Sequence, residues 1–329
     1  MKNAVYCQRN SSISIQFIFN TNQAMTTTLI QMALLISCGI VWRFLKPIGL
    51  EADQTRLVLT TVVYYLLLPA MILHVLWQAE IGVQSLKFSQ LAVFSIIFGI
   101  TAMWLCGRLF KINNFRLGAL VLAAGFPNVT YLGLPVLEQT FGPWARSVAI
   151  QMDLFAGLPL LFTLGILIAR YFGEQGAEKK KPIYTFLNTP PFWMAAVAVT
   201  MNVLQISEPS WLSGVLQRLA GGVVPLMLFS LGLALNWQAI SIRNLPYVVP
   251  VIVVKMLLIP LFALWANNYI GITGEAKTAA LLETAMPSMV LGIVFCDRYR
   301  LDASLYAMVV TVTTVLSLVT LPFWYRIMQ

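Results

Sequence analysis

The sequence predicts an all-α integral membrane protein, with ten transmembrane helices arranged as two inverted repeats of five. Composition supports this fold, since 59% of the residues are hydrophobic, 10% are charged and the mean hydropathy is +0.80. A soluble domain carries roughly 25% charged residues, so this chain has too few to cover the surface of a globule. The apolar residues also come in blocks of about 20, the length that crosses a bilayer core. Similar features then recur in the two halves of the chain, so we expect a protein whose surroundings are lipid.

The first 24 residues differ in composition from the rest of the chain. They contain Lys2 and Arg9, no acidic residue, and the mixed stretch SSISIQFIFNTNQ, which has neither a clean apolar core nor a cleavage site. Met25 stands directly before the first apolar block. We therefore expect residues 1–24 to form a poorly ordered extension and not a signal peptide.

Apolar blocks and the helix breakers between them predict ten spans from Met25 onward. The fourth and ninth spans are interrupted, by GFPNVTYLGLP from Gly125 and by AMPSMVLG from Ala285. The longest loop, residues 173–184, is a linker between a first five-helix repeat at 25–172 and a second, inverted repeat at 185–329. The predicted spans cover residues 25–45, 55–77, 88–110, 115–141, 146–171, 185–205, 211–235, 245–268, 276–297 and 302–326.

Basic residues in the loops predict the orientation of the chain, because loops rich in Lys and Arg stay in the cytoplasm. Alternate loops fall on alternate sides of the membrane. One side carries Arg43, Lys46, Arg56, Arg108, Lys111, Arg116, Arg170, Lys179, Lys180, Lys181, Arg243, Arg298 and Arg300. The other side carries only Lys2, Arg9, Lys87, Arg146, Lys277 and Arg326. We therefore expect a multi-pass protein of the cell (inner) membrane, with the first set cytoplasmic and both termini outside.

The net charge of +9 does not indicate a nucleic-acid partner, since the basic residues sit in short loops and form no continuous stripe. The four cysteines have no CxxC or metal-ligand spacing, and a single histidine, His74, cannot make a histidine-rich metal site. We expect no metal centre and no cofactor.

The two halves of the chain resemble each other. Span two carries Pro69 in LLLPAMIL and span seven carries Pro225 in VVPLMLF. The proline of the following broken span lies 58 residues after Pro69, at Pro127, and 62 residues after Pro225, at Pro287. An odd number of spans in each half places the two copies in opposite orientations, which predicts an inverted repeat.

The broken spans are the expected functional site. Proline removes a backbone donor, and in lipid the freed groups must be satisfied by protein, water or ligand. Matching breaks in inverted halves indicate a transporter site near the bilayer midplane. The N-termini of the half-helices carry partial positive charge, which suits an anion. A tolerated kink explains a single proline such as Pro127 or Pro287, but it explains a matched pair less well.

Three ionisable residues lie well inside predicted spans: Asp153, Lys255 and Glu283. A charged side chain that faces lipid has a high free-energy cost, so we expect all three to face the protein interior and to have partners there. An Asp153–Lys255 pair is geometrically allowed, either as a proton-sensitive latch or as a permanent neutral bridge. Glu283 precedes Pro287 by four residues and so shares a helical face with the break. Its carboxylate can bind a proton or a cation, or it can bond the unwound backbone.

Several short motifs occur in a fixed order along the chain: LPAMIL from Leu68, NVTYLGLPV from Asn128, DLFAGLPLLFTLG from Asp153, Lys255 before Pro260, AMPS from Ala285 and SLVTLP from Ser317. In these motifs, the chain from Met25 onward resembles the auxin efflux carrier family. That family of membrane transport proteins includes plant auxin carriers and bacterial malonate and malate carriers.

The resemblance implies the ten-helix fold of sodium–bile-acid symporters, in which broken helices four and nine cross at their prolines and the helices divide into a scaffold and a transport domain. By matching positions, Pro127 and Pro287 are the crossover prolines, with Asn128 and Ser288 beside the substrate.

The resemblance also bears on ions. A glutamate before the second crossover helps hold sodium in the sodium-coupled relatives, and Glu283 falls on that position. Its polar partner on span five falls near Ser147 and Gln151. Proline at position 287 departs from the polar ligand of those symporters. The Asp153–Lys255 arrangement also resembles the acid–lysine pair of sodium–proton antiporters of related architecture.

The preferred interpretation is a secondary active transporter of a small organic anion, a carboxylate such as malonate, malate or an auxin-like acid, by elevator-type alternating access. Asn128, Tyr131 and Ser288 would supply hydrogen bonds, and Asp153, Lys255 and Glu283 would couple the cycle to protons or sodium. The alternative keeps the fold but exchanges a cation for protons.

Other classes fit less well. The chain contains no HExxH, paired-aspartate or serine–lysine signature, so we do not expect an enzyme. A membrane sensor would need a partner protein, because the cytoplasmic loop is too short for an effector domain. A homodimer is compatible with a fixed scaffold.

Overall fold

The protein is helical throughout the part that the structure describes. A computed structural model describes residues 30–173, 189–235, 237 and 240–329. No strand forms within these ranges, and one isolated β-bridge joins Pro127 to Ser288. The all-α prediction is therefore confirmed for these residues. The expected extension at 1–24 and the linker at 173–184, apart from Gly173, lie outside them.

The helices follow the predicted apolar blocks. Six helical runs are long and apolar enough to cross a membrane: Ala52–Trp77, Val83–Leu109, Ala145–Phe172, Ser210–Ala234, Ile242–Ile270 and Ala303–Met328. Ile30–Leu45 and Asn114–Gly125 are shorter apolar helices. These lengths and compositions agree with an integral membrane protein.

Individual elements subdivide these runs. They are α2 (Ala52–Val62), η2 (Val63–Leu67), α3 (Leu68–Trp77), α4 (Val83–Leu109), α5 (Asn114–Gly125), η3 (Val129–Gly133), α6 (Leu134–Phe141), α7 (Ala145–Met152), η4 (Asp153–Gly157), α8 (Leu158–Leu160), η5 (Leu161–Gly165), α9 (Ile166–Phe172), α11 (Pro190–Val203), α12 (Ser210–Gly221), α13 (Val223–Ala234), η7 (Ile242–Asn244), α14 (Leu245–Val253), η8 (Val254–Leu258), α15 (Ile259–Ile270), α16 (Gly274–Thr284), α17 (Gly292–Arg298) and α18 (Ala303–Met328).

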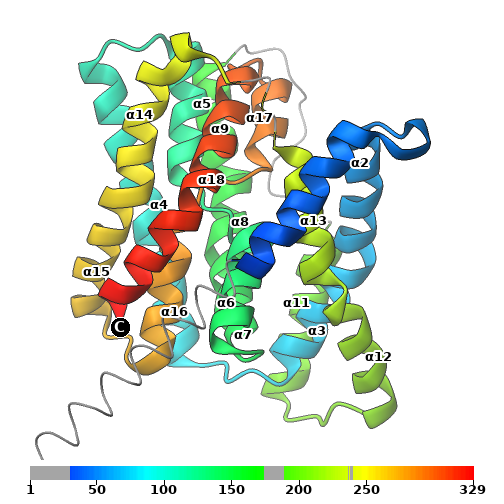
Figure 1. Ribbon diagram of the computed structural model, residues 1–329. Helices are drawn as coiled ribbons and strands as arrows, with labels where there is room; N and C mark the ends of the chain where they lie inside the picture. Colours follow the sequence, from blue (N-terminus) through cyan, green and yellow to red (C-terminus); the bar gives the residue numbers. More distant parts are fainter. Residues whose placement is uncertain (1–29, 174–188, 236, 238–239) are drawn as a thin grey trace, which may run out of the picture.

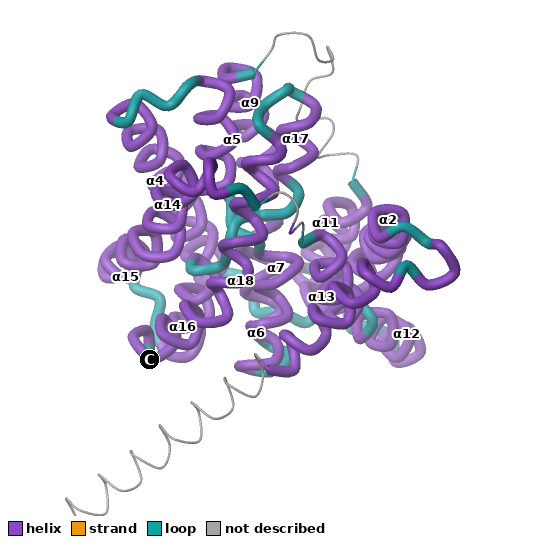
Figure 2. Tube along the Cα trace, turned by 45° about the horizontal axis from the view of Figure 1, so that its top comes forward, coloured by secondary structure: helices purple, strands orange, loops and turns teal. Residues whose placement is uncertain are grey.

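The helices divide into two groups (Figures 1 and 2). The smaller group contains Ile30–Leu45, α2, α3, α11, α12 and α13, with α11 and α12 packed on α3 and α13 packed on α2. The larger group contains α4 to α9 and α14 to α18. The two groups meet where η3 and α6 pack against α13, and α7 against α3. The boundary between the two groups therefore passes beside the break that precedes η3.

Four prolines are each preceded by a wide, π-type turn. The residue before each proline (Leu68, Leu134, Leu158 or Ile259) donates its N–H to the carbonyl five residues back instead of four. Proline causes this because it has no N–H and its ring collides with the carbonyl four residues earlier. Such turns rotate the side chains they carry, and they are frequent at functional sites.

The carbonyl that Pro260 leaves without a helical donor has a replacement partner. A residue at position 260 would normally bond the carbonyl of Met256. In this structure the indole Nε1 of Trp324, on α18, donates to that oxygen at 2.7 Å. A residue of another helix therefore bonds the carbonyl that the wide turn of η8 leaves free, as burial in lipid requires.

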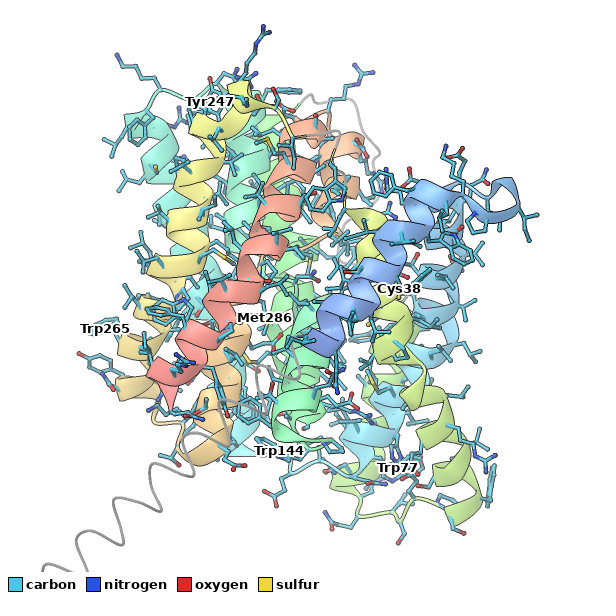
Figure 3. The ribbon with its side chains drawn as sticks, in the orientation of Figure 1. Cys38, Trp77, Trp144, Tyr247, Trp265 and Met286 are labelled. Atoms are coloured by element: carbon cyan, nitrogen blue, oxygen red, sulfur yellow. The ribbon has the colours of Figure 1, made fainter. Side chains whose placement is uncertain are left out.

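Aromatic and basic side chains mark the two ends of the bundle (Figure 3). Trp77 and Trp144 lie near one end, and Tyr247 lies at the other. At the Tyr247 end, Arg116 bonds Asp302 with Nε 3.3 Å from Oδ2, and its guanidinium lies 4.7 Å from the Tyr247 ring centroid. These contacts join α5, α14 and the start of α18.

Two glycines allow close contact between the first described helix and α13. A Cβ on Gly39 would lie 2.9 Å from the backbone N of Leu233 and 3.0 Å from the Cα of Gly232. Close approach of small residues is a common basis of helix packing in membranes. Arg43 strengthens the contact, since its Nη1 donates to the Leu233 carbonyl at 2.6 Å.

Replacing Gly232 with leucine is therefore expected to separate these helices. We expect Gly232→Leu to destabilise the protein by about 1–3 kcal/mol, the usual cost of overpacking. The lower melting temperature should appear by differential scanning fluorimetry of the purified protein. Gly214→Leu is the matched control, because nothing lies within 4 Å of a Cβ at Gly214. Equal melting temperatures for the two variants would contradict the packing described here.

Candidate functional site

The two broken segments cross and bond each other through their backbones. Helix α5 ends at Gly125 and η3 begins at Val129, while α16 ends at Thr284 and α17 begins at Gly292. Between the breaks, the N–H of Asn128 donates to the Pro287 carbonyl at 2.8 Å, and the N–H of Met289 donates to the Phe126 carbonyl at 3.0 Å. The crossing therefore satisfies part of the backbone that the breaks expose.

Helix α18 supports the second break. The Tyr306 hydroxyl donates to the Met289 carbonyl at 2.7 Å, and the N–H of Ser288 donates to Thr313 Oγ1 at 3.2 Å. The ring of Tyr306 also lies against Gly292, where any Cβ would collide with its hydroxyl. These contacts hold the break in place.

Two polar side chains at the crossing have no partner among the described residues. The amide oxygen and nitrogen of Asn128 and the hydroxyl of Ser288 are buried without a hydrogen bond. Asn128 is 1% exposed and Ser288 is fully buried. Buried polar atoms are normally bonded, so these groups are the ones a ligand or a water can satisfy.

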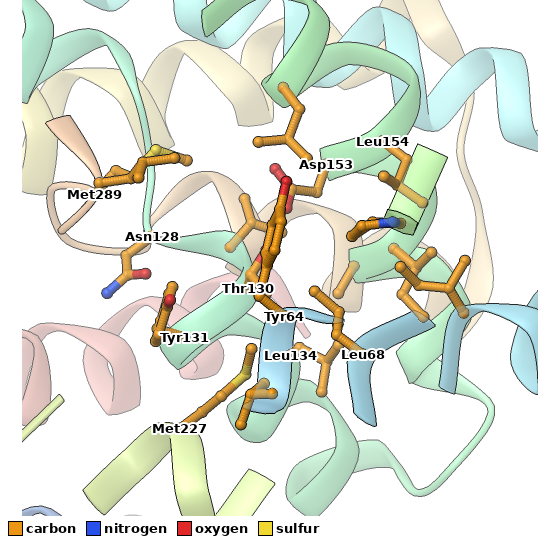
Figure 4. Close-up of a pocket in the computed structure, with 18 residues that line it drawn as sticks. Tyr64, Leu68, Asn128, Thr130, Tyr131, Leu134, Asp153, Leu154, Met227 and Met289 are labelled. Carbon is orange, nitrogen blue, oxygen red and sulfur yellow. The ribbon is translucent and has the colours of Figure 1, made fainter. Parts of the chain in front are cut away.

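A cavity of about 90 Å³ lies beside the crossing, between the two groups of helices (Figure 4). Asn128, Thr130 and Tyr131 line it from η3 and its N-cap, and Asp153 lines it from η4. The smaller group supplies Val63, Tyr64, Leu68, Ile72, Pro191 and Met227. Most of the lining is apolar, so the few polar groups are placed to orient a bound molecule.

Asp153 faces this cavity and has one partner. Its Oδ2 accepts a hydrogen bond from the Thr130 hydroxyl, while its Oδ1 is buried without one. A Cβ on Gly157 would lie 2.8 Å from that Oδ1, so glycine there leaves room for the carboxylate. Two wide turns therefore bring Thr130 and Asp153 together.

A second, smaller cavity of about 20 Å³ also borders the first break, and Val129 lines both cavities. Pro127, Ser95, Lys255 and Glu283 are among the residues that line it. Lys255 is 1% exposed, Glu283 is fully buried, and neither Glu283 oxygen has a hydrogen-bond partner. The space is enough for about one water molecule. A Cβ on Gly133 would collide with the Glu283 carboxylate, so any larger residue at that position would displace this carboxylate.

The Asp153–Lys255 pair that the sequence allowed does not form among the described residues. Asp153 bonds Thr130, and Lys255 faces the small cavity with Glu283. Similar depth along two spans does not determine the direction in which each side chain points. The wide turns of η4 and η8 turn the two residues toward different cavities.

Gln151 also lies away from the crossing. Its Nε2 donates to Ser147 Oγ at 2.6 Å, and both residues line a third cavity of about 670 Å³ with Trp144 and Arg146. Arg146 forms an ion pair with Glu138 at this end of the bundle. No hydrogen bond joins Gln151 to Glu283 among the described residues, since both Glu283 oxygens lack a partner.

The predicted site residues fall into three places. Asn128, Tyr131 and Asp153 share the 90 Å³ cavity, and Pro127, Lys255 and Glu283 share the 20 Å³ cavity. Pro287 and Ser288 are buried at the crossing itself. Sequence reasoning missed Thr130 and Tyr64. Each stands five residues before a proline, Pro135 or Pro69, and this spacing is the signal that could have found them.

In the described part of the chain, no group of three or more His, Cys, Asp or Glu side chains could hold a metal ion. Glu283 as a sodium ligand therefore stays a prediction, as do the binding and coupling roles of the other residues.

Comparison with known proteins finds one family profile and several relatives that match most of the chain. Residues 24–187 and 179–325 match the profile of a family described as "Membrane transport protein". An uncharacterized transporter of Methanothermobacter thermautotrophicus is 29% identical over 305 residues, which cover 91% of this chain and 97% of the relative. The uncharacterized transporter MJ1031 of Methanocaldococcus jannaschii is 27% identical over 87% of this chain and 94% of its own length. The uncharacterized transporter YfdV of Escherichia coli is 20% identical over 67% of this chain and 70% of its own length.

Proposed function

Because the chain belongs to the membrane transport protein family, the family of the auxin efflux carriers, we propose that it is a secondary active transporter of a small carboxylate that binds at the crossing. The protein is a membrane transporter with several apolar helices, and its relatives are named transporters, not enzymes. We propose in addition the identity of the cargo, the coupling ion and the transport cycle.

One observation carries the proposal: buried polar groups without partners meet a helix N-terminus in a cavity at the crossing. The helical run from Val129 to Phe141 begins at this cavity, and its first N–H groups have no helical acceptor. A carboxylate there would be stabilised by the helix dipole and by the Asn128 amide. The same groups would be costly to leave unbonded in lipid.

The proposed topology has ten spans in two inverted repeats. The helices from Ile30 to Phe172 and those from Pro190 to Met328 each contain five predicted spans, and each set breaks its fourth. An odd number of spans gives the two sets opposite orientations. The distribution of loop Lys and Arg supports a cytoplasmic linker and outer termini in the cell (inner) membrane.

We propose that the larger group of helices moves against the smaller one, as in an elevator. The cavity supports this mechanism, because η3 and η4 of the larger group and η2, α11 and α13 of the smaller group all line it. Sliding along this boundary would carry Asn128 and Asp153 past the walls formed by Tyr64 and Met227. A fixed smaller group would also allow a homodimer.

Size and charge favour a small monocarboxylate. A dry cavity of about 150 Å³ holds benzene, so a cavity of about 90 Å³ fits a molecule of only a few heavy atoms. An indole-sized, auxin-like acid does not fit this conformation. Dicarboxylates such as malonate or malate carry two charges, and the residues that line the cavity include no Lys, Arg or His.

Glu283 and Lys255 are the proposed coupling groups. They line one water-sized cavity directly beside the crossing, so a change in their charge would act on the bridge between the breaks. An ammonium group in this cavity disfavours a sodium ion beside it, which favours a proton as the coupling ion. The alternative function, exchange of sodium or another cation for protons, places the cation near Glu283.

Transport by purified protein in liposomes tests the proposal. We expect saturable uptake of radiolabelled lactate above the level of protein-free liposomes, and slower uptake of malonate. If sodium instead changes the signal of a trapped pH dye and neither carboxylate is taken up, the cation antiporter is correct.

A further inference from the structure

We propose that the transported carboxylate also carries an ammonium group that binds Asp153, so that the cargo is a small apolar amino acid. The inference rests on the proposed function, because it uses the same cavity and the same carboxylate position. It adds the second charged group of the cargo and the residue that selects it.

The first observation is the free oxygen of Asp153. Its side chain is buried in the cavity wall, with the residue 5% exposed, and Oδ1 has no hydrogen-bond partner. Thr130 bonds the other oxygen and so fixes the direction of the carboxylate. Gly157 makes room for Oδ1 at a position where a Cβ would lie 2.8 Å away. The carboxylate is therefore held in place with one acceptor oxygen still to be satisfied.

The second observation is that no cationic side chain of the described residues lines this cavity beside Asp153. No Lys, Arg or His lines the 90 Å³ cavity, and the buried Lys255 lines the other cavity. A buried carboxylate without a cation is strongly disfavoured, especially at membrane depth. An ammonium group on the cargo would supply the missing cation and donate to Oδ1.

The third observation is the opposite polarity of the neighbouring wall. The helical run Val129–Phe141 begins at the cavity, and Asn128 at its start has an unbonded amide and is 1% exposed. A cargo carboxylate fits this wall, while its ammonium fits Asp153. The helix start at Asn128 and the carboxylate of Asp153 thus give the cavity one positive and one negative wall, and Figure 4 labels both residues in the lining. An α-amino acid carries both charges on adjacent atoms, and in this cavity each would be neutralised.

The other residues that line the cavity determine the size and polarity of the side chain that the cargo can carry. Leu68, Leu134, Met227 and Met289 contribute apolar wall. A volume of about 90 Å³ leaves room for a methyl group or little more. Alanine is therefore the probe of choice.

Three isosteric probes isolate the ammonium group: L-alanine, L-lactate and isobutyrate, in which the same position carries an ammonium, a hydroxyl or a methyl group. Their Kd values are measured by isothermal titration calorimetry on the full chain in lipid nanodiscs. We expect alanine to bind at least about tenfold more tightly than isobutyrate, the effect of one charge-assisted hydrogen bond. Asp153→Asn should remove this preference and leave the Kd of isobutyrate nearly unchanged.

Asp297→Asn is the matched control, since Asp297 is exposed at the end of α17 and should leave all three Kd values as in the wild type. Equal binding of alanine and isobutyrate, or tightest binding of lactate, would overturn the ammonium proposal and leave a carboxylate transporter in place. Equal losses for alanine and isobutyrate in Asp153→Asn would also overturn it. Binding of none of the three probes, together with no carboxylate uptake in liposomes, would reject the proposed function itself.

Discussion

Asn128→Ala is expected to lower carboxylate affinity by about 10- to 100-fold, the effect of losing hydrogen bonds to a charged group. The amide is buried at the start of η3, faces the cavity and has no partner among the described residues. Its removal should affect the bound cargo more than the fold, because the crossing itself uses the backbone N–H of this residue and not its side chain.

The measurement is saturable lactate uptake in proteoliposomes, with the amount of folded protein fixed by size-exclusion chromatography. Asn268→Ala on α15 is the matched control, since Asn268 is exposed and away from both cavities. Wild-type uptake by Asn128→Ala would remove this residue from the site.

Lys255→Met is expected to have the largest effect on stability. No direct ion pair joins Lys255 to Glu283 among the described residues, but both line one water-sized cavity, and the substitution removes the only cationic side chain from that lining. If the two charges stabilise each other across the cavity, removal of one costs about 3–5 kcal/mol, as for other buried charged pairs. The melting temperature in detergent should fall accordingly, and Glu283→Gln alone should also lower it.

The double variant distinguishes a charge effect from a packing effect. If Lys255 and Glu283 neutralise each other across the water-sized cavity, Lys255→Met combined with Glu283→Gln should be more stable than Lys255→Met alone. Strictly additive losses would show that the two groups do not interact. Glu283→Gln should in addition change the pH dependence of uptake if Glu283 has a coupling role.

Much of the helical arrangement could be predicted because lipid imposes strong limits on sequence. Apolar blocks marked the long helices, and Pro127 and Pro287 marked the two breaks, since a backbone that loses donors in lipid needs another partner. The direct bonds between Asn128 and Pro287 and between Met289 and Phe126 were not predicted. They depend on how two distant segments meet, which spacing along the chain does not encode.

The directions of the polar side chains were harder to predict. An ordinary helix would place Asp153 and Lys255 by a period of 3.6 residues per turn. The wide turns before Pro159 and Pro260 change that period locally. The proline spacing contains this information, because Tyr64, Thr130 and Lys255 each precede a proline by five residues. With this rule, the sequence would have indicated Thr130 and Tyr64 as well.

Residues of the smaller group that line the cavity could not be inferred from motifs. Met227 and Pro191 contribute only apolar surface, and their role depends on packing between the two groups of helices. Gln151 was predicted beside Glu283 because it lies on the fifth span, but α7 turns it toward the 670 Å³ cavity. The position of a residue along a helix does not by itself determine which of two buried faces of that helix its side chain occupies.

The proposed transport cycle requires that the crossing cavity open in turn to each side of the membrane. Leu134→Cys, in a background without the native cysteines, places one thiol in the cavity wall. A membrane-impermeant maleimide, applied from outside or from the cytoplasmic side of oriented vesicles, measures its accessibility. Alternating access predicts labelling from both sides. Lactate should slow this labelling in the protein that keeps Asn128, and it should not slow it in Asn128→Ala. Labelling from one side only, or from neither, with or without cargo, would contradict alternating access.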